Sequence, residues 1–264
     1  MQLEFYQVDA FTQHAFGGNP AIVYRLDTWL ADELMQKIAA EHNLAETAFL
    51  VQEPEGWHIR WFTPTTEVPL CGHATLASAY VLFNYYLKAA DTLQFNSKSG
   101  PLSVRREGER LWLDFPAREA TEHGVTLDVE RALGLDVVDV LNSDSLLVVL
   151  ESEEAVRNCK PDLAAVAKLA WPGVIITARG KNYDFVSRYF APAIGIAEDA
   201  VTGAAHCSLI PYWSKRLAKF RLTAFQCSAR GGELLCYLNK DRVEIGGYAT
   251  LVATGQLLAG HLNG

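Results

Sequence analysis

One acidic residue in an apolar stretch is the first candidate for chemistry. Glu46 is the only charged residue within residues 43–50, where leucine, alanine and phenylalanine are its neighbours. A carboxylate in such surroundings is partly desolvated, which favours its neutral form and suits a group that takes up and releases a proton near neutral pH. We interpret Glu46 as a general acid/base, with a solvated loop acid as the alternative.

Two other segments place a glycine where a helix is expected to start: 69–75 contains Gly72, and 198–206 contains Gly203. The backbone N–H groups in the first turn of a helix have no intrahelical partner, and with the helix dipole they favour a carboxylate or phosphate. A glycine lets a ligand approach these groups, although ordinary helix caps are the alternative. The candidate substrate-binding residues are Gly72, Thr202, Gly203 and Ala204.

His73 and Asp199 add one titratable group beside each of these helix starts. Taken alone, a histidine at such a place is commonly a structural residue, and an aspartate there can be an N-terminal cap. Their joint occurrence favours a functional role. The candidate catalytic residues are therefore Glu46, His73 and Asp199.

Other chemical motifs are weak or absent. Zinc could be imagined on Cys71, His73, His206 and Cys207, but the last two are adjacent and would point in different directions from a helix, so no metal site is predicted. Cys71 has no evident oriented base and is interpreted as a packed thiol rather than a nucleophile. The glycine-rich nucleotide motifs and the hydrolase G-x-S-x-G motif do not occur.

The elements that must position these residues are repeated along the chain. The segments that match, in the same order and about 130 residues apart, are 60–64 with 188–192, 100–113 with 232–245, and the amphipathic helices 32–39 with 161–168. The pair 100–113 and 232–245 alternates as two strands around a turn, at Glu107-Gly108 and at Asn239-Lys240. We infer a tandem duplication.

Each half also contains a helix without charge, at 74–87 and 204–213. A helix that is apolar on every face is surrounded by protein, and Pro211 should kink the second one or end its first segment. The sequence therefore predicts an α+β fold of two similar lobes, each a β-barrel-like sheet wrapped around a central apolar helix. The expected lobes are 1–117 and 118–264, with the last residues able to return to the N-terminal lobe.

The candidate catalytic residues lie where the two halves differ. The aligned pairs are Glu46 with Val174, His73 with Ala204, and Asp199 with Val68. Because a duplicated scaffold keeps its packing in both copies, chemistry is expected at such asymmetric positions. If the halves pack face to face, both helix starts can point into one cleft, and we predict a buried acid/base site there.

Composition restricts the class of protein. The chain has 264 residues, half of them hydrophobic, with a formal charge of −8, which argues against nucleic-acid and membrane partners. Its five cysteines form no C-x-x-C pair and are expected to be reduced thiols in the cytoplasm. The start lacks the pattern of a signal peptide, and the apolar run 146–150 is too short to span a bilayer.

Several segments carry a resemblance to a known family. They are residues 8–11, 16–21, 43–49, 62–64, 70–75, 198–206 and 231–234. Over nearly the whole chain the sequence resembles the phenazine-biosynthesis isomerase (PhzF-like) family and, through it, diaminopimelate epimerase. The resemblance implies two lobes with the site in the cleft between them, no cofactor and a homodimer. It makes Glu46 the proton-transferring residue and gives His73 and Asp199 the task of holding or polarising the substrate.

The chain departs from the family pattern at three positions. The family often has serine before the glutamate, proline after the aspartate and serine after the glycine, where this chain has Ala45, Ala200 and Ala204. Pockets built around hydrogen bonds discriminate strongly between substrates. The loss of two hydroxyls therefore bears on substrate choice and leaves the proton-transfer residues intact.

These observations lead to one main hypothesis and two alternatives. The main hypothesis is a cofactor-independent isomerase that moves a proton between carbons of a small carboxylate-bearing substrate, because one carboxylate can serve both carbons on one face. The alternatives are an amino-acid racemase or epimerase and a non-catalytic ligand-binding protein of the same fold. A racemase with two thiols is disfavoured because no cysteine lies between Glu198 and Gly203.

Overall fold

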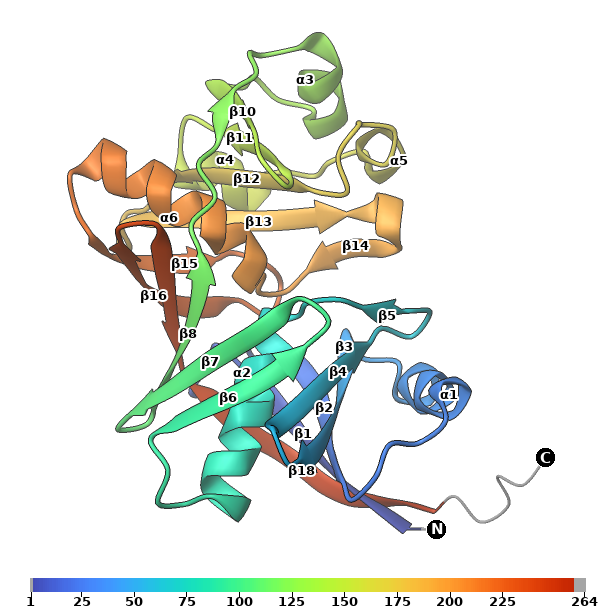
Figure 1. Ribbon diagram of the computed structural model, residues 1–264. Helices are drawn as coiled ribbons and strands as arrows, with labels where there is room; N and C mark the ends of the chain where they lie inside the picture. Colours follow the sequence, from blue (N-terminus) through green and yellow to red (C-terminus); the bar gives the residue numbers. More distant parts are fainter. Residues whose placement is uncertain (1, 259–264) are drawn as a thin grey trace. The chain divides into compact units, whose positions relative to one another are not determined.

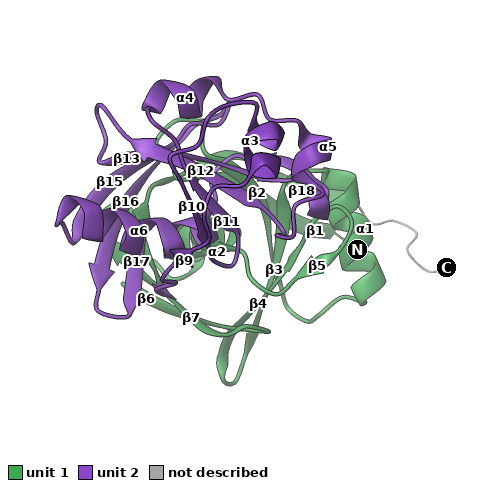
Figure 2. Ribbon diagram, turned by 90° about the horizontal axis from the view of Figure 1, so that it is seen from above, with its two compact units in different colours: residues 1–114, 246–264 green, residues 115–245 purple. Residues whose placement is uncertain are grey.

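The computed structural model describes residues 2–258, which form two compact units (Figures 1 and 2). Of these residues, 2–114 and 246–258 belong to unit 1, drawn green in Figure 2, and Phe115–Ile245 form unit 2, drawn purple. Unit 1 is thus made from both ends of the described chain. Each unit has its own set of strands and helices.

The sheet of unit 1 is mixed. Its strands are β1 (Gln2–Ala10), β2 (Asn19–Leu26), β3 (Glu46–Glu53), β4 (Gly56–Phe62), β5 (Glu67–Val68), β6 (Thr92–Ser97), β7 (Gly100–Glu107), β8 (Arg110–Pro116) and β18 (Ala249–Leu258). Neighbouring strands pair in the order β18, β1, β2, β3, β4, β6, β7, β8, and β5 adds to β4. The pairs β2–β3 and β4–β6 are parallel, and the other pairs are antiparallel.

Two helices accompany this sheet. Helix α1 (Asp32–His42) begins with two acidic residues, which suit the positive end of the helix dipole. Helix α2 (Gly72–Val81) packs against β1, β2, β3 and β18, and Tyr80 is its only residue that is not buried. It continues into a π-helical turn, η1 (Leu82–Tyr86). The prediction of an enclosed helix over 74–87, drawn from its lack of charge, is confirmed for residues 74–83, whereas residues 84–86 are exposed.

Unit 2 has a similar set of strands. They are β9 (Thr121–Glu122), β10 (Asp139–Asn142), β11 (Leu146–Val149), β12 (Val174–Arg179), β13 (Phe185–Ala191), β14 (Ile196–Asp199), β15 (Arg221–Gln226), β16 (Gly232–Asn239) and β17 (Arg242–Gly247). The pairing order is β9, β10, β11, β12, β13, β15, β16, with β14 added to β13. The pairs β11–β12 and β13–β15 are parallel, and the other pairs are antiparallel. In the strand order these two parallel pairs correspond to β2–β3 and β4–β6 of unit 1.

The helices of unit 2 are α3 (Leu127–Leu133), α4 (Glu153–Asn158), α5 (Leu163–Val166), the short 3₁₀ turn η2 (Pro192–Ile194) and α6 (Gly203–Leu217). Helix α5 is shorter than the expected helix 161–168, and the Asp162 carboxylate caps it by accepting hydrogen bonds from two backbone N–H groups. Helix α6 packs against β15 and β16 and runs through Pro211, so one of the two expected effects of this proline, an end of the first helical segment, is wrong; a kink at Pro211 stays a prediction. Its last turn carries Lys215 and Arg216, which are exposed.

The strand pairing confirms the duplication. Glu46 opens β3 opposite Ala21 of the parallel strand β2, and Val174 opens β12 opposite Leu146 of the parallel strand β11. The predicted hairpins are present, but each turn lies one residue later than expected. Gly108 and Lys240 are the first turn residues, and both have a positive φ, which the tight turn requires.

No helix among residues 2–258 is long and apolar enough to cross a membrane.

Candidate active site

A buried carboxylate opens strand β3. Glu46 is 8% exposed, and the five residues that follow it in the strand are all buried as well. The strand is central in the sheet of unit 1, with β2 on one side and β4 on the other. At the matching position of unit 2, Val174 is 1% exposed. The structure therefore places a carboxylate in a position that its duplicate fills with an apolar side chain.

His73 is the charged partner of this carboxylate. It is the second residue of the enclosed helix α2 and is 3% exposed. Its Nε2 atom lies 2.9 Å from Oε2 of Glu46. Two residues that the sequence singled out separately, 27 positions apart, are thus in direct contact. Because both side chains are buried, the electrostatic attraction between them is stronger than that of an exposed ion pair at the same distance.

Asn19 completes the contacts of the His73 ring. It is the first residue of β2, is buried, and its Nδ2 atom lies 3.0 Å from Nδ1 of His73. An amide has a donor on one side and an acceptor on the other, so it can serve either protonation state of an imidazole ring if it turns over. Sequence reasoning missed this residue, although it lies inside the segment 16–21 that carries the family resemblance.

Cys71 also lies next to the ring of His73. Its Sγ atom is 3.5 Å from Nδ1 and 4.0 Å from Nε2 of His73. Burial, and to a smaller extent the charge of Glu46, raises the pKa of this thiol to about 11. Cys71 is therefore a protonated thiol near neutral pH, which agrees with its interpretation as a packed rather than a nucleophilic cysteine.

The ring of His73 favours its charged form. Burial alone would lower its pKa, but the negative charge that Cys71 would carry as a thiolate and the charge of Glu46 raise the pKa well above its usual value. Since Cys71 keeps its proton near neutral pH, we attribute the effect mainly to Glu46. The charged form of the His73 ring is consequently favoured where its Nε2 atom faces Glu46.

The same three side chains have the donor types of a metal site. One ligand atom each from Glu46, Cys71 and His73 lies within 4.8 Å of the others. However, both ring nitrogens of His73 face other side chains, Nε2 toward Glu46 and Nδ1 toward Asn19. The arrangement fits a proton-transfer cluster better than a metal centre.

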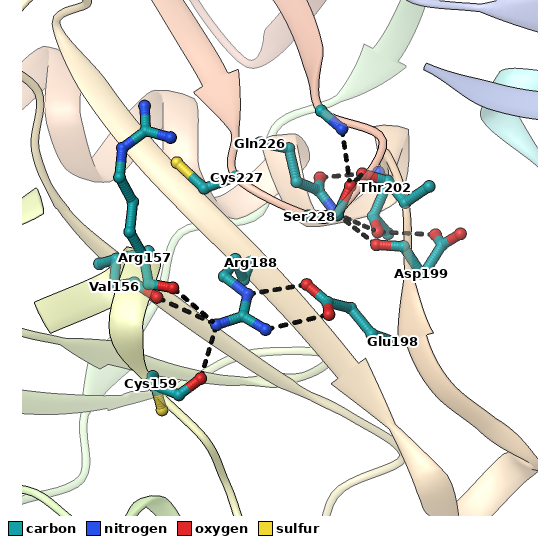
Figure 3. Close-up of polar contacts among 12 residues, drawn as sticks. Val156, Arg157, Cys159, Arg188, Glu198, Asp199, Thr202, Gln226, Cys227 and Ser228 are labelled. Carbon is teal, nitrogen blue, oxygen red and sulfur yellow. Dashed lines mark hydrogen bonds and ion pairs between the residues drawn. The ribbon is translucent and has the colours of Figure 1, made fainter. Parts of the chain in front are cut away.

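Gly72, the other predicted residue of unit 1, is the buried first residue of α2. The remaining predicted residues, Asp199, Thr202, Gly203 and Ala204, belong to unit 2 and lie at the start of α6; Figure 3 shows Asp199 and Thr202. Asp199 ends β14, and its Oδ2 atom accepts a hydrogen bond of 2.6 Å from the Thr202 hydroxyl. Thr202 makes no side-chain cap to α6, so the alternative of an ordinary cap does not describe it. Gly203 is the first residue of the helix and Ala204 is exposed.

Gln226 is a second residue that sequence reasoning missed. It ends β15, is fully buried and contacts both Asp199 and Thr202 through its amide group, as Figure 3 shows. An uncharged amide in a strand has no feature in the sequence that indicates such a role. Ser228, two residues further on, donates to the backbone carbonyl of Ala200 at 2.8 Å.

Each unit has an arginine–glutamate pair in the strands that precede its α2 or α6 helix. Arg60 of β4 donates two hydrogen bonds of 2.8 Å to Glu67, and Arg188 of β13 donates to Glu198 at 2.8 and 3.0 Å (Figure 3). Such two-pronged pairs fix geometry as well as charge. Glu198 is next to Asp199, and Glu67 precedes the segment that leads to Cys71. The pairs therefore brace the approach to each helix start.

His206 and Cys207, which were considered as zinc ligands, are buried side chains of helix α6. The Nδ1 atom of His206 lies 2.9 Å from the Thr202 carbonyl oxygen, and burial lowers the pKa of the ring to about 4. Burial raises the pKa of Cys207 to about 12. Neither belongs to the cluster of ligand-type atoms found in the described part of the chain.

A duplicated α+β fold, with one enclosed helix starting beside a buried carboxylate–histidine pair, defines a protein of the diaminopimelate epimerase-like class. The predicted fold class is confirmed by solved structures. A predicted epimerase from Pseudomonas aeruginosa has a TM-score of 0.79 at 22% identity, over 98% of this chain and 100% of that one, which shows a common fold.

Closer relatives identify the family. The family model described as "Phenazine biosynthesis-like protein" matches residues 8–255. A Pseudomonas aeruginosa protein named as an uncharacterized isomerase is 66% identical over 97% of this chain and 99% of its own length. The crystal structure of a PhzF-family phenazine biosynthesis protein from Enterococcus faecalis has a TM-score of 0.96 at 48% identity, over 97% of this chain and 99% of that chain. The chain therefore belongs to the phenazine biosynthesis-like protein family, and it is an isomerase.

Proposed function

We propose that this isomerase moves a proton between two carbons of a small carboxylate-bearing substrate without a cofactor, and that Glu46 is its general acid/base. The observation that carries the proposal is the buried pair of Glu46 and His73, with Oε2 and Nε2 2.9 Å apart. A carboxylate that is kept from water and oriented by a partner has the properties required of such a group.

The two carboxylate oxygens are assigned different tasks. Oε2 faces His73 and is shielded from solvent, so Oε1 is the oxygen that would meet the substrate. It takes a proton from one carbon and returns it to another carbon on the same face. His73 holds the carboxylate in place and balances its charge, while Asn19 holds the ring of His73.

A single base favours isomerisation over racemisation. Inverting a stereocentre needs an acid and a base on opposite faces of one carbon. The thiol closest to the pair in sequence and space, Cys71, has a pKa of about 11 and is a poor base near neutral pH. Transfer on one face needs only Glu46.

Substrate recognition is assigned to the helix starts. Gly72 opens α2 and Gly203 opens α6, where N–H groups and the helix dipole suit a carboxylate. Thr202, Ala204 and Asp199 are proposed to contact the polar part of the substrate. Binding in a cleft between the lobes, a homodimer and a cytoplasmic location stay predictions.

Proton NMR in D₂O tests the reaction class. The protein is incubated with trans-2,3-dihydro-3-hydroxyanthranilate and, separately, with a panel of amino acids. Conversion of the first compound supports the phenazine-type isomerisation. Deuterium at an α-carbon in the panel would instead indicate a racemase or epimerase.

A variant then tests Glu46 itself. Glu46→Gln is isosteric and cannot act as a base, so turnover should fall by about 100-fold or more while calorimetric affinity for the same compound is largely kept. Glu41→Gln changes an exposed acid of α1 and is the matched control. Normal turnover by Glu46→Gln would show that the role given to Glu46 is wrong.

A further inference from the structure

The hydrogen bonds around Gln226 fix the orientation of its amide group. Its Oε1 atom lies 2.8 Å from the backbone nitrogen of Thr202, which can only donate, so this atom must be the acceptor. The Nε2 atom on the other side donates to the Asp199 carbonyl at 2.8 Å and to the Thr202 hydroxyl at 3.1 Å. With the amide fully buried, no water competes for these positions.

This orientation in turn directs the proton of the Thr202 hydroxyl. A hydroxyl has a single proton, and the Thr202 oxygen already accepts a hydrogen bond from Gln226. Its proton is then free to point at Oδ2 of Asp199, 2.6 Å away. If Gln226 presented an acceptor instead, the hydroxyl could turn its proton to Gln226 and away from Asp199.

We propose that Gln226 is a positioning residue that fixes the Asp199 side chain through the Thr202 hydroxyl (Figure 3). The inference rests on the proposed function in one respect, namely that Asp199 acts on the substrate. The amide group of Gln226 makes its hydrogen bonds to Thr202 and to the backbone carbonyl of Asp199, where β14 leads into α6. Its task is to keep one rotamer of Asp199 and to favour its ionised form, because a carboxylate is stabilised by each hydrogen bond that it accepts.

Three other titratable groups lie near Asp199. Tyr189 of β13 is opposite Asp199 in the strand pairing. Glu198 is the preceding residue in the chain and forms an ion pair with Arg188. Variants that add no charge leave these groups as they are. Gln226→Met removes the amide, and Thr202→Val removes the hydroxyl at nearly constant shape.

The test compares these two variants with two controls. Both should lower kcat/KM by about tenfold to a hundredfold, as expected for a hydrogen bond to a charged group, and both should move the acidic limb of the pH–rate profile to higher pH. Thr202→Ser, which restores the hydroxyl, should recover most of the loss. Ser228→Ala removes the neighbouring bond to Ala200 and should leave the pH profile in place.

Coupling between the two positions separates a relay from general damage. Both variants act on the bond from the Thr202 hydroxyl to Asp199, and Gln226→Met also removes the bonds to the Thr202 N–H and the Asp199 carbonyl. The double variant should therefore lose little more than Gln226→Met alone, whereas independent defects would multiply. If Gln226→Met does not fold, the comparison of Thr202→Val with Thr202→Ser carries the same test. Multiplying losses, or an unchanged pH profile in both single variants, would overturn the inference.

A readout without turnover keeps the two proposals distinct. With ¹³C-labelled aspartate, and Asp199→Asn to assign the signal, the carboxyl titration of Asp199 should move to higher pH in Gln226→Met and Thr202→Val but not in Ser228→Ala. A moved titration with unchanged activity would support the role of Gln226 and refute the role of Asp199 in catalysis. An unmoved titration, together with an inactive Asp199→Asn, would refute the role of Gln226 alone.

Discussion

His206 makes the stability of the protein dependent on pH in a way that can be measured. The side chain is fully buried in the first turns of α6, and its ring lies 5.8 Å from that of Phe185, between ring centroids, in a tilted arrangement. Burial lowers the pKa of the ring from 6.5 to about 4, against a smaller opposing effect of the hydrogen bond to the Thr202 carbonyl. The folded protein therefore keeps the ring neutral where the unfolded chain would bind a proton.

The sign and size of the effect follow from this difference. Because the unfolded state binds more protons as the pH falls from 6.5 to about 4, the free energy of unfolding decreases over that range. The whole difference corresponds to about 3 kcal/mol at 1.36 kcal/mol per pKa unit, of which about 2.5 kcal/mol is lost between about pH 7.5 and about pH 4.5.

Urea unfolding of the wild type and of His206→Gln at these two pH values tests the prediction. The glutamine keeps a donor for the Thr202 carbonyl and does not titrate. It lacks the buried imidazole ring, so the variant should be less stable than the wild type at the higher pH. That gap should shrink by about 2.5 kcal/mol at the lower pH. His14→Gln, at an exposed loop position, is the control and should follow the wild type at both values.

A constant gap between the wild type and His206→Gln would refute the reasoning. It would mean that the ring is already charged in the folded protein, or that protonation does not meet a buried environment. In either case the structural role given to His206 would have to be abandoned.

Three further predictions concern backbone strain, thiols and metals. Gly18→Ala should destabilise the protein by more than about 2 kcal/mol, because φ is +59° and a Cβ would lie 2.0 Å from the Ala10 carbonyl oxygen, whereas Gly108→Ala, at φ +62° with open space, should cost only about 1 kcal/mol in urea unfolding. Native protein should not react with a disulfide thiol reagent near neutral pH, whereas urea-unfolded protein should react at all five cysteines. The reason is that all five are buried in the folded protein and that the pKa values of Cys71, Cys207 and Cys227 are about 11, 12 and 11. Fast reaction of the native protein would contradict the burial. Dialysis against a chelator should leave turnover unchanged, because Glu46 and His73 use their facing atoms on each other; lost activity that zinc restores would show that Glu46, Cys71 and His73 hold a metal.

Much of the fold could be predicted because its causes are local. The lack of charge in 74–87 predicts an enclosed helix without knowledge of what encloses it, and α2 is buried on almost every residue. Pro211 shows the limit of such reasoning. Proline removes one backbone donor, but the packed first part of α6 and its contacts with β15 and β16 keep the helix continuous.

The site was predicted less completely, for a physical reason. Glu46, His73 and Asp199 stand out because titratable groups in apolar segments are costly and therefore noticeable. Asn19 and Gln226 are neutral, and their roles depend on which segments fold side by side. Asn19 reaches His73 across 54 residues and Gln226 reaches Thr202 across 24, through strand pairings that a single sequence does not define.

The duplication shows which positions of unit 2 match the buried pair of Glu46 and His73 in unit 1. Val174 occupies the position of Glu46 in unit 2 and is 1% exposed, so a carboxylate there would be buried as deeply. Its natural partner would come from the position of His73, which unit 2 fills with the exposed Ala204. A buried charge without a partner costs several kcal/mol, and pairing with an imidazolium offsets part of that cost. Removal of either Glu46 or His73 would leave the other buried without its facing partner, so we expect the two positions to depend on each other, whereas unit 2, with Val174 and Ala204 at the matching positions, has neither group.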